Sequence, residues 1–330
     1  MEHSFSVIIP VYNGLPYLRE CLESILQQTY PHYNILVLDS GSTDGSLEYI
    51  RSLETARVQL FTTSSRLTIE ENWERIKTIS RNEFMTIIGQ DDLLLPGYLA
   101  EMNELINQCP DASLYQTHFN YIDARGRLLR KCQSMEPRIT EARFLECQID
   151  RRLDSTATGY MMRSRDYDTV GGISPEFRNL IFADYELWMK LTAMQYLAVS
   201  RNTCFCYRIH DSVSKITNGD DYAAAFGKYV YFLAGRRSAD KAVAGVLDQK
   251  GQSFLLYFCQ SLSHRLLKMP AAIRQTSVKN FIQACRQYAS LLIPGQAFTP
   301  EKKFLIRIAE ILDRNKAGRF LFGIYQRLKK

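Results

Sequence analysis

Two adjacent carboxylates follow an apolar run in the segment "FMTIIGQDDLLLPGYL", residues 84–99. The apolar residues predict a buried strand, and Asp91 and Asp92 stand directly after it. Two like charges at this spacing raise each other's pKa unless a positive charge lies beside them. A solvated loop would tolerate the pair, but adjacent carboxylates also supply the oxygen ligands that Mg²⁺ and Mn²⁺ prefer. We therefore predict a divalent-cation site at these two aspartates.

Two more polar clusters stand at the ends of predicted strands. Tyr12 and Asn13 follow the apolar run "FSVIIPV", and Asp39 and Ser40 follow the run "ILVL". In an open parallel sheet, ligands bind beyond the carboxyl ends of the strands. A single aspartate at such a position is usually a turn former. Three polar clusters at the same edge of one sheet predict a ligand site.

Strands and helices alternate through the first 110 residues. Strands are expected at residues 5–13, 35–38, 57–63 and 83–89. Helices are expected at residues 15–26, from about residue 46, and at residues 68–80 and 97–109, and Thr68 with Glu71 forms a predicted capping box. Such alternation predicts an α/β fold with a Rossmann-like, mostly parallel sheet and helices on both faces.

The pattern changes beyond residue 110. Strands are expected at residues 112–123, 157–163 and 196–210, with a helix at 184–194 between the last two. From residue 222 onward the pattern is helical. We predict an α/β domain over residues 1–218 and a C-terminal helical region over residues 219–330, with the boundary in "SVSKITNGDD".

The composition is that of a globular protein. The chain has 330 residues, of which 46% are hydrophobic and 23% charged. No apolar run approaches the length of a membrane span, and the N-terminus shows no signal peptide. The eight cysteines are scattered without zinc-ligand spacing, so we expect reduced thiols in a cytoplasmic protein.

The positive charge is concentrated at one end. Residues 301–330 contain nine Lys or Arg and three acids, which accounts for the whole net charge of +6. An apolar stripe lies among these charges, consisting of Phe320, Leu321, Ile324 and Leu328 with Arg319, Arg327, Lys329 and Lys330 around it. A basic amphipathic helix of this kind can lie on an anionic membrane. It can equally pack on the body of the protein or on a second subunit.

Several nucleotide and hydrolase motifs are absent. The sequence has no G-x-G-x-x-G after the first strand, no G-x-x-x-x-G-K-[ST] and no G-x-S-x-G. These absences argue against a dinucleotide fingerprint, a P-loop and an α/β-hydrolase. Without a P-loop lysine, the diphosphate of a bound nucleotide needs a metal to neutralise it.

Six segments in order resemble family 2 glycosyltransferases with the GT-A fold. The N-terminal segments "PVYN", "QTY" and "DSGSTDGS" have the usual spacing, and "GQDDLLLPG" resembles the metal motif of the family. The segment "VGGISPEFRNLIFADYELWMKL" is similar to the one that ends in the catalytic acid, and "YRIHDSVS" is similar to a stretch that often follows it. The resemblance extends over residues 5–214.

The resemblance implies a nucleotide-binding set. The backbone around Pro10 and Val11 would hold the nucleobase, with Tyr12 stacked on it, and Asp39 would bind the nucleoside. The other predicted nucleotide-binding residues are Asn13, Ser40, Asn72 and Asp91. Asn72 can also be a supporting or surface residue on its helix.

The resemblance also implies the chemical roles. Asp92, helped by Asp91, would hold the metal on the diphosphate, and His210 would add a metal or phosphate contact. Asp184 would be the general base. Two of these have simpler alternatives, because Asp184 can be an N-cap or a partner of the helix dipole, and His210 can be an ordinary structural histidine. Trp73 and Trp188 are expected in the core.

Three positions depart from the family pattern. Ser40 replaces an acid that commonly recognises the base, Gly89 replaces the first acid of the metal motif, and Ala183 replaces the acid before the base. The nucleotide therefore stays undetermined. The essential carboxylates remain, but the site has fewer acids than is usual in the family.

These features predict a metal-dependent, inverting glycosyltransferase of the hexosyl or N-acetylhexosaminyl class. It would use Mn²⁺ or Mg²⁺ and a nucleotide diphosphate sugar. The acceptor would be a hydroxyl of a glycan or lipid-linked molecule in surface polysaccharide synthesis, at the inner face of the membrane. A single base opposite the leaving group predicts inversion at the anomeric carbon.

Two rival functions and several open points remain at this stage. A nucleotidyltransferase should carry a basic loop after the first strand, and "VYNGLPY" has no Lys or Arg. A non-catalytic nucleotide-sugar binding or scaffold protein is compatible with the reduced number of acids. Nucleic-acid binding is not expected, because residues 1–300 carry no net positive charge. The donor sugar, the acceptor and a possible homodimer are not determined by the sequence.

Overall fold

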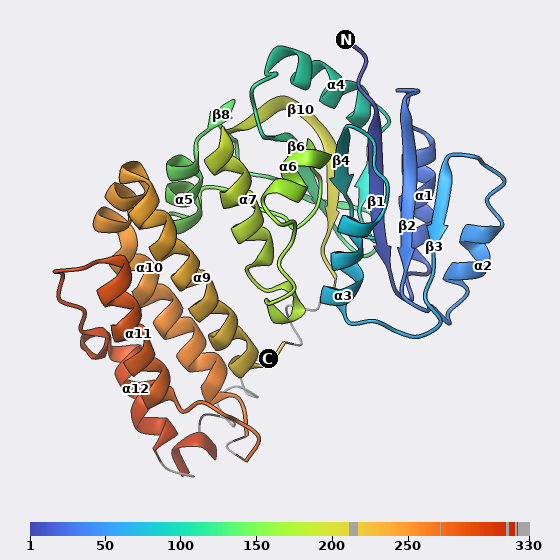
Figure 1. The fold of residues 1–330 in the computed structure, drawn as a ribbon. Coiled ribbons are helices and arrows are strands. Elements are labelled where there is room, and N and C mark those ends of the chain that lie inside the picture. The colour runs from blue at the N-terminus through green and yellow to red at the C-terminus, as the bar shows by residue number, and fades with distance from the viewer. Residues whose placement is uncertain (211–216, 271, 315–316, 321, 323–330) are drawn as a thin grey trace. The chain divides into compact units, whose positions relative to one another are not determined.

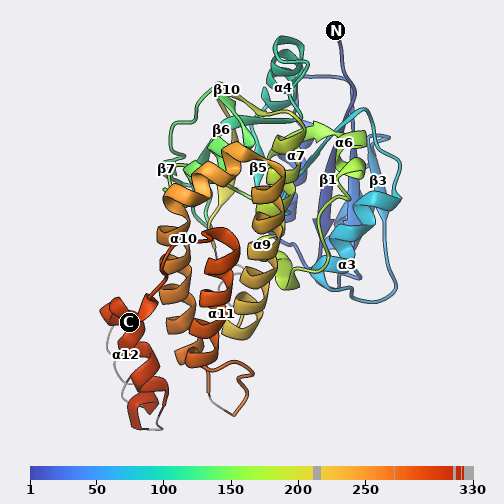
Figure 2. The same cartoon turned by 60° about the vertical axis from the view of Figure 1, so that its left-hand side comes forward.

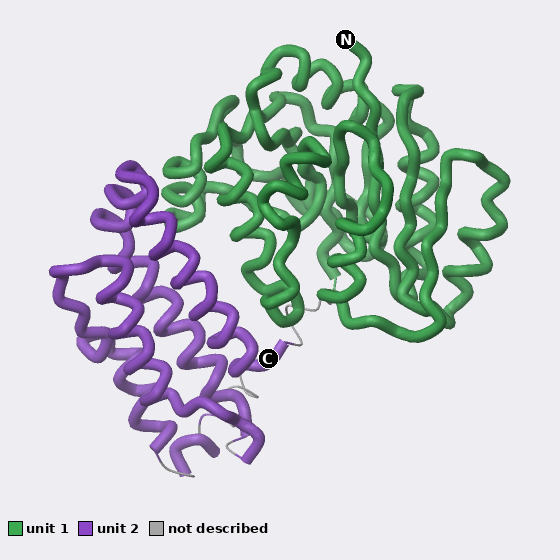
Figure 3. Tube along the Cα trace, in the orientation of Figure 1, with its two compact units in different colours: residues 1–212 green, residues 213–330 purple. Residues whose placement is uncertain are grey.

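The computed structural model describes residues 1–210, 217–270, 272–314, 317–320 and 322. Contacts divide the chain into two compact units, Met1–Ser212 (unit 1) and Val213–Lys330 (unit 2), coloured separately in Figure 3. The predicted domain division after residue 218 stays a prediction. Residues 212–216 of the predicted boundary segment lie outside the described residues.

Within the described residues, unit 1 contains a ten-stranded sheet in the order β3-β2-β1-β4-β9-β6-β10-β5, with β7 beside β6 and β8 beside β10 (Figure 1). Its strands are β1 (Phe5–Val11), β2 (Tyr33–Asp39), β3 (Val58–Phe61), β4 (Phe84–Ile87), β5 (Leu93–Leu94), β6 (Leu114–Ile122), β7 (Leu128–Lys131), β8 (Arg138–Ile139), β9 (Tyr160–Arg163) and β10 (Leu197–Arg208). Its helices are α1 (Tyr17–Leu26), α2 (Ser46–Arg51), α3 (Ile69–Glu74), η1 (Arg75–Thr78), α4 (Tyr98–Gln108), α5 (Glu141–Ile149), α6 (Ser164–Thr169), η2 (Arg178–Leu180) and α7 (Ala183–Met194).

The predicted α/β fold with a mostly parallel sheet is confirmed. Strand β1 runs parallel to β2 and β4, β2 runs parallel to β3, and β6 runs parallel to β10, whereas each antiparallel pairing joins only two or three residue pairs. Every residue of β1 is buried, as expected for a strand covered on both faces. Figure 1 shows helices on both faces of the sheet.

The register brings the predicted polar clusters to one edge. Val11 pairs with Asp39 at the carboxyl ends of β1 and β2, and Ile8 pairs with Ile87 at the end of β4. The residues that follow these three strands therefore emerge on the same side of the sheet.

The predicted capping box at the start of α3 is also confirmed. The Thr68 hydroxyl accepts from the backbone N–H of Glu71 at 3.2 Å, and the Glu71 carboxylate accepts from the backbone N–H of Thr68 at 2.7 Å. Two backbone donors that the first helical turn leaves unpaired are thereby satisfied.

Unit 2 is helical, as its sequence pattern indicates. It consists of α9 (Gly219–Ala239), α10 (Lys241–Leu267), α11 (Val278–Leu292), η3 (Pro300–Lys302) and α12 (Phe304–Asp313). Figure 2 shows α9, α10 and α11 side by side, and the rings of Phe226 and Phe258 stack between α9 and α10 at 4.6 Å. The Arg274 guanidinium and Asp313 form a buried ion pair at 2.7 Å. Among the described residues, none of the helices combines the length and the apolar character that crossing a bilayer requires.

The predicted amphipathic tail lies mostly outside the described residues, which include Arg319 and Phe320 but not 321 or 323–330. The Phe320 side chain is exposed. All eight cysteines are free thiols, as predicted.

Gly159, which precedes β9, gives a test of how the sheet packs against the Phe205 side chain of β10. Its φ is +81°, and a Cβ atom there would lie 2.7 Å from the Phe205 ring of β10. We expect Gly159→Ala to lower the free energy of unfolding by about 2–4 kcal/mol, from left-handed strain and overpacking. Gly97→Ala is the matched control, because a Cβ atom there meets nothing within 4 Å. Urea denaturation measures both, and equal stability of the two variants would contradict the described packing.

Candidate functional site

The loops after β1 and β2 are tied together by side chain to backbone hydrogen bonds. The Asn13 backbone N–H donates to the Ser42 hydroxyl at 2.9 Å, and the Asn13 side-chain oxygen accepts from the Thr43 N–H at 2.8 Å. Asn13 adopts a left-handed φ of 48°, which asparagine tolerates better than most residues. Pro10 and Val11 are buried at the end of β1, where the Val11 carbonyl accepts from the Ser40 N–H at 2.9 Å. The predicted nucleotide loops therefore form one ordered edge.

Asp39 has one carboxylate oxygen engaged and one without a partner. Its Oδ2 accepts from the backbone N–H groups of Gly41 and Ser42 at 3.0 and 3.2 Å. Its Oδ1 is buried and has no hydrogen-bond partner within the described part of the chain. A buried acceptor without a donor is costly unless something else pairs with it. A donor group of a bound nucleoside would satisfy it.

Ser40 and Asn72 support this edge through contacts within the protein. The Ser40 hydroxyl accepts from the Leu67 N–H at 2.7 Å, which holds the loop after β3. The buried Asn72 amide donates to the Leu38 carbonyl at 2.9 Å and accepts from Arg75 at 2.8 Å. Arg75 in turn donates to the Asp39 carbonyl at 2.9 Å. The interpretation of Asn72 as a surface residue is therefore wrong, and its predicted place in the nucleotide-binding set stays a prediction.

The ring of Tyr12, predicted to stack on the nucleobase, is partly covered. The Arg66 guanidinium lies 4.5 Å from its centroid as a cation–π contact. The backbone N–H of Tyr12 donates to Oε1 of Gln90 at 3.0 Å, and the carbonyl of Tyr12 accepts from Nε2 of Gln90 at 3.2 Å. Gln90 thereby joins the end of β1 to the loop that carries Asp91 and Asp92.

The two adjacent aspartates lie in this loop, residues 88–92, which we call the acid loop, and they differ in environment. Asp92 is 2% exposed. Its Oδ1 accepts from the Arg208 backbone N–H at 2.9 Å, and its Oδ2 accepts from the Thr158 hydroxyl at 2.7 Å. Burial first, and then the charge of Asp91, raise the pKa of Asp92 to about 8. Both oxygens of Asp92 are therefore already engaged by the protein.

Asp91 is the more accessible carboxylate of the pair. Its side chain is 26% exposed, and its Oδ2 contacts Nε2 of His210, whose side chain is 28% exposed. This hydrogen bond raises the pKa of the His210 ring. The geometry thus favours Asp91 with His210, rather than Asp92, as the pair that a metal or phosphate can reach. The predicted ligand role of Asp92 stays a prediction.

Gly89 leaves space beside both carboxylates. A Cβ atom at this position would lie 2.6 Å from Asp91 Oδ1 and 2.9 Å from Asp92 Oδ2. Any side chain here would fill the space between the two groups. The glycine that replaces an acid of the family pattern therefore keeps a small oxygen-lined cradle open.

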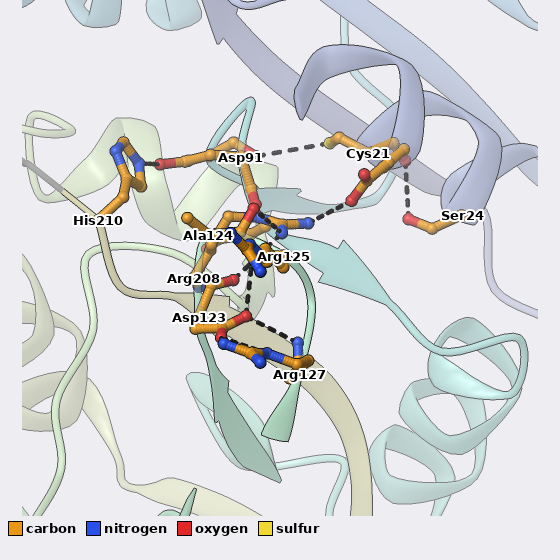
Figure 4. A network of polar contacts seen from close by, with 12 residues as sticks. Cys21, Ser24, Asp91, Asp123, Ala124, Arg125, Arg127, Arg208 and His210 are labelled. Carbon is orange, nitrogen blue, oxygen red and sulfur yellow. Dashed lines mark hydrogen bonds and ion pairs between the residues drawn. The ribbon is translucent and has the colours of Figure 1, made fainter. Parts of the chain in front are cut away.

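Arg208, at the end of β10, is the residue that the sequence prediction missed. Its side chain is fully buried, and its Nε donates to the Asp91 carbonyl at 2.7 Å. Its other nitrogens contact the Glu20 carboxylate of α1 and the Asp123 carbonyl after β6. Figure 4 shows Arg208 in the middle of this network, with His210 against Asp91. The guanidinium therefore holds the backbone of the acid loop, while the pKa of Asp92 stays raised beside it.

Asp184 lies in the first turn of α7 after a strained turn. Asn179, Leu180 and Phe182 all have positive φ, and the Asn179 N–H donates to Glu70 of α3. Strain of this kind persists where surrounding contacts enforce it, often at functional sites. The helix begins at Ala183 with Phe182 at the N-cap, so Asp184 is not the helix cap. Burial raises the pKa of Asp184 to about 6.

A chain of contacts joins α7 to the acid loop. The Trp188 indole donates to the Thr156 carbonyl at 3.0 Å, and the Thr156 hydroxyl donates to the Thr158 carbonyl at 2.7 Å. The Thr158 hydroxyl then donates to Asp92. Trp188 is buried, as predicted, and so is Trp73.

The phenol of Tyr207 lies within electrostatic reach of three of the predicted acids. Its pKa is raised by burial and then by the negative charges of Asp91, Asp92 and Asp184. The acid loop and the predicted base therefore act on the same side chain. Asp91, Asp92 and Asp184 thus share Tyr207 as a neighbour, whereas Asp39 is not among the charges that act on it.

Comparisons with known proteins agree with the family resemblance that the sequence motifs indicate. Residues 6–168 match the family model described as Glycosyl transferase family 2. This stretch of the chain is a family 2 glycosyltransferase domain. The glycosyltransferase GlyG of Streptococcus pneumoniae serotype 4 is 27% identical over 128 residues, which cover 38% of this chain and 42% of GlyG. The matches span 25–42% of the length of the first curated relatives.

Solved structures confirm the GT-A fold. Staphylococcus aureus TarS, residues 1–349, superposes with a TM-score of 0.63 at 14% identity, covering 99% of this chain and 92% of that one. The mannosyltransferase PcManGT from Pyrobaculum calidifontis gives a TM-score of 0.50 at 16% identity, covering 98% of this chain and 84% of that one. TarS has been solved with UDP-GlcNAc, and PcManGT with GDP-Man and Mn²⁺.

The residues of the glycosyltransferase domain fit a divalent cation that is shared with a diphosphate. Within the described part of the chain, no group of three or more His, Cys, Asp or Glu side chains forms a complete protein cage. A carboxylate, an imidazole and the cradle at Gly89 offer a partial set of ligands. Mg²⁺ in nucleotide sites typically takes one or two carboxylates together with substrate phosphates.

Arg208 provides the test of how the acid loop is held. We expect Arg208→Gln to lower the free energy of unfolding by about 3 kcal/mol, because the Asp91 carbonyl of the acid loop and the carbonyls of Asp123 and Ala124 lose their donor. Arg165→Gln is the control, since its side chain is 81% exposed, and we expect a change below about 1 kcal/mol. Thermal unfolding compares the two variants. Equal melting temperatures would contradict a stabilising role of Arg208 at the acid loop.

Proposed function

We propose that the chain transfers a sugar from a nucleotide diphosphate sugar to an acceptor hydroxyl with inversion. The observation that carries this proposal is the position of Asp184 in the first turn of α7, the helix that Trp188, Thr156 and Thr158 link to Asp92 of the acid loop. The family 2 domain supports it, and so do the nucleotide sugars bound by TarS and PcManGT. The acceptor we propose is a glycan or lipid-linked molecule in surface polysaccharide synthesis at the inner face of the membrane.

In this proposal the chain's own residues bind and orient the donor. Asp39 Oδ1 accepts a hydrogen bond from the nucleoside, and Tyr12 and Arg66 face the base. Asp91 and His210 would hold Mn²⁺ or Mg²⁺ on the diphosphate. When bound, the ion supplies Lewis-acid stabilisation of the leaving diphosphate. Asp92 keeps the acid loop in place through Arg208 and Thr158.

Asp184 removes the proton of the acceptor hydroxyl. The hydroxyl oxygen forms a bond to the anomeric carbon while the bond from that carbon to the phosphate oxygen breaks. The electron pair of that bond leaves with the nucleoside diphosphate, and the proton stays on the Asp184 carboxylate. One displacement from the face opposite the leaving group inverts the anomeric centre.

Replacing Asp184 tests the base. We expect Asp184→Asn to reduce turnover of the preferred nucleotide sugar by about 10²–10⁴-fold, because the amide cannot accept the proton. Nucleoside diphosphate release from a panel of nucleotide sugars with Mn²⁺ measures turnover, and calorimetry should show unchanged donor binding. Full activity of the variant would remove Asp184 from the mechanism. Donor binding without turnover by the wild-type chain would favour the non-catalytic alternative.

The pH profile tests the same group independently. The pKa of Asp184 is raised from 3.8 to about 6, and the base acts only when ionised. Activity should therefore be lost as pH falls through 6, with kcat/KM about tenfold lower at pH 5 than at pH 7. A profile that stays flat down to pH 5, with the protein still folded, would contradict the assignment.

Metal titration tests Asp91 and His210. We expect the chelated enzyme to lose turnover and to regain it with Mn²⁺. In Asp91→Asn the half-saturating Mn²⁺ concentration should rise about tenfold or more, because a ligand charge is lost. Glu186→Gln is the control on α7, since Glu186 pairs with Lys190 at 3.2 Å. Equal Mn²⁺ dependence in Asp91→Asn and wild type would exclude Asp91 as a ligand.

A further inference from the structure

The turn and strand that follow β6 carry cations together with exposed leucines. Residues 123–131, "DARGRLLRK", which we call the basic hairpin, contain four Lys or Arg and one acid. Leu128 is 58% exposed and Leu129 is 54% exposed. Within the described residues of unit 1, Met1 is the only other large hydrophobic residue more than half exposed. Two adjacent leucines in water among cations need an explanation.

The basic hairpin is ordered rather than loose. Asp123 Oδ1 accepts from the backbone N–H groups of Arg125 and Arg127 at 2.8 and 2.9 Å, and Gly126 takes the left-handed φ of +76° that the turn requires. In the described sheet, β7 pairs only with β6, so its other edge has no strand beside it (Figure 2). The leucines are therefore held outward by a fixed turn.

Protection of an edge strand explains the cations but not the leucines. Edge strands use charged residues to prevent pairing with other chains. Exposed leucines have the opposite effect, because they favour association. Arg127 pairs with Asp123 and Arg130 pairs with Asp154, whereas no ion pair of Arg125 or Lys131 is found among the described residues. The combination fits a surface that is anionic outside and apolar beneath, which is the structure of a lipid bilayer.

The basic hairpin starts at the candidate site. The Arg208 guanidinium contacts the carbonyls of Asp123 and Ala124 at 3.3 and 3.4 Å, and it donates to the Asp91 carbonyl at 2.7 Å. Figure 4 shows these groups in one network. Arg208 therefore joins the first residues of the basic hairpin to the acid loop.

We propose that the basic hairpin docks unit 1 on an anionic lipid bilayer, with Leu128 and Leu129 inserted at the acyl boundary and Arg125 and Lys131 on the head groups. This inference deepens the proposed function, because a lipid-linked acceptor presents its hydroxyl at that surface. A soluble polyanion would match the cations but would leave the leucines in water. The C-terminal basic segment is a separate candidate for membrane contact and stays a prediction.

A tryptophan reporter tests the insertion without any assay of turnover. Trp73 and Trp188 are both buried, so their emission should not respond to vesicles. We expect the emission of Leu128→Trp to shift to shorter wavelength when vesicles of phosphatidylglycerol and phosphatidylcholine in equal parts are added. Ile273→Trp, at a position 68% exposed in unit 2, should show no shift. An unshifted Leu128→Trp, or an equal shift with soluble inorganic polyphosphate, would overturn the proposal.

Vesicle sedimentation gives the second measurement. The double variant Leu128→Ser/Leu129→Ser should bind the same vesicles about tenfold more weakly than wild type. Ile273→Ser should bind like wild type, and all three should have equal melting temperatures. Undiminished binding by the double serine variant would overturn the proposal. Because neither measurement needs a nucleotide sugar, failure here is distinguishable from failure of the proposed transferase activity.

Discussion

The candidate site depends on one buried cation. Arg208 carries a fully buried guanidinium to the place where two adjacent aspartates end a strand. Its Nε donates to the Asp91 carbonyl, so Arg208 holds the backbone of the acid loop. The same side chain contacts α1, the acid loop and the start of the basic hairpin. Its position therefore fixes three segments that the chain brings from distant parts of the sequence.

The two aspartates of the acid loop differ in environment. Asp92 is buried and has both oxygens hydrogen-bonded within the protein, whereas Asp91 contacts His210 at a more accessible position. Through Thr158, Thr156 and Trp188, the acid loop is also linked to the helix of the proposed base. The acid loop, proposed to hold the metal, and α7, which carries the proposed base, are thus joined by one continuous set of polar contacts.

The sequence predicted the parts of the site that depend on local pattern. Apolar runs that alternate with helical segments predicted β1, β2 and β4. Because these strands pair in parallel, the polar residues after them lie at one edge of the sheet. The different roles of Asp91 and Asp92 were not predictable, because the donors to Asp92 come from positions 66 and 116 residues further along the chain. The contact of Arg66 with the Tyr12 ring was missed for the same reason. Periodicity reports which elements form, but not which side chains from distant elements meet.

The most direct measurement is a crystal structure of the chain with a nucleoside diphosphate and Mn²⁺, with the ion located by its anomalous scattering. The account predicts a manganese peak in bonding contact with Asp91 and the diphosphate, next to His210, while Asp92 keeps its contacts to Arg208 and Thr158. A peak bound through Asp92 after those contacts break, or an ion remote from the acid loop, would contradict it.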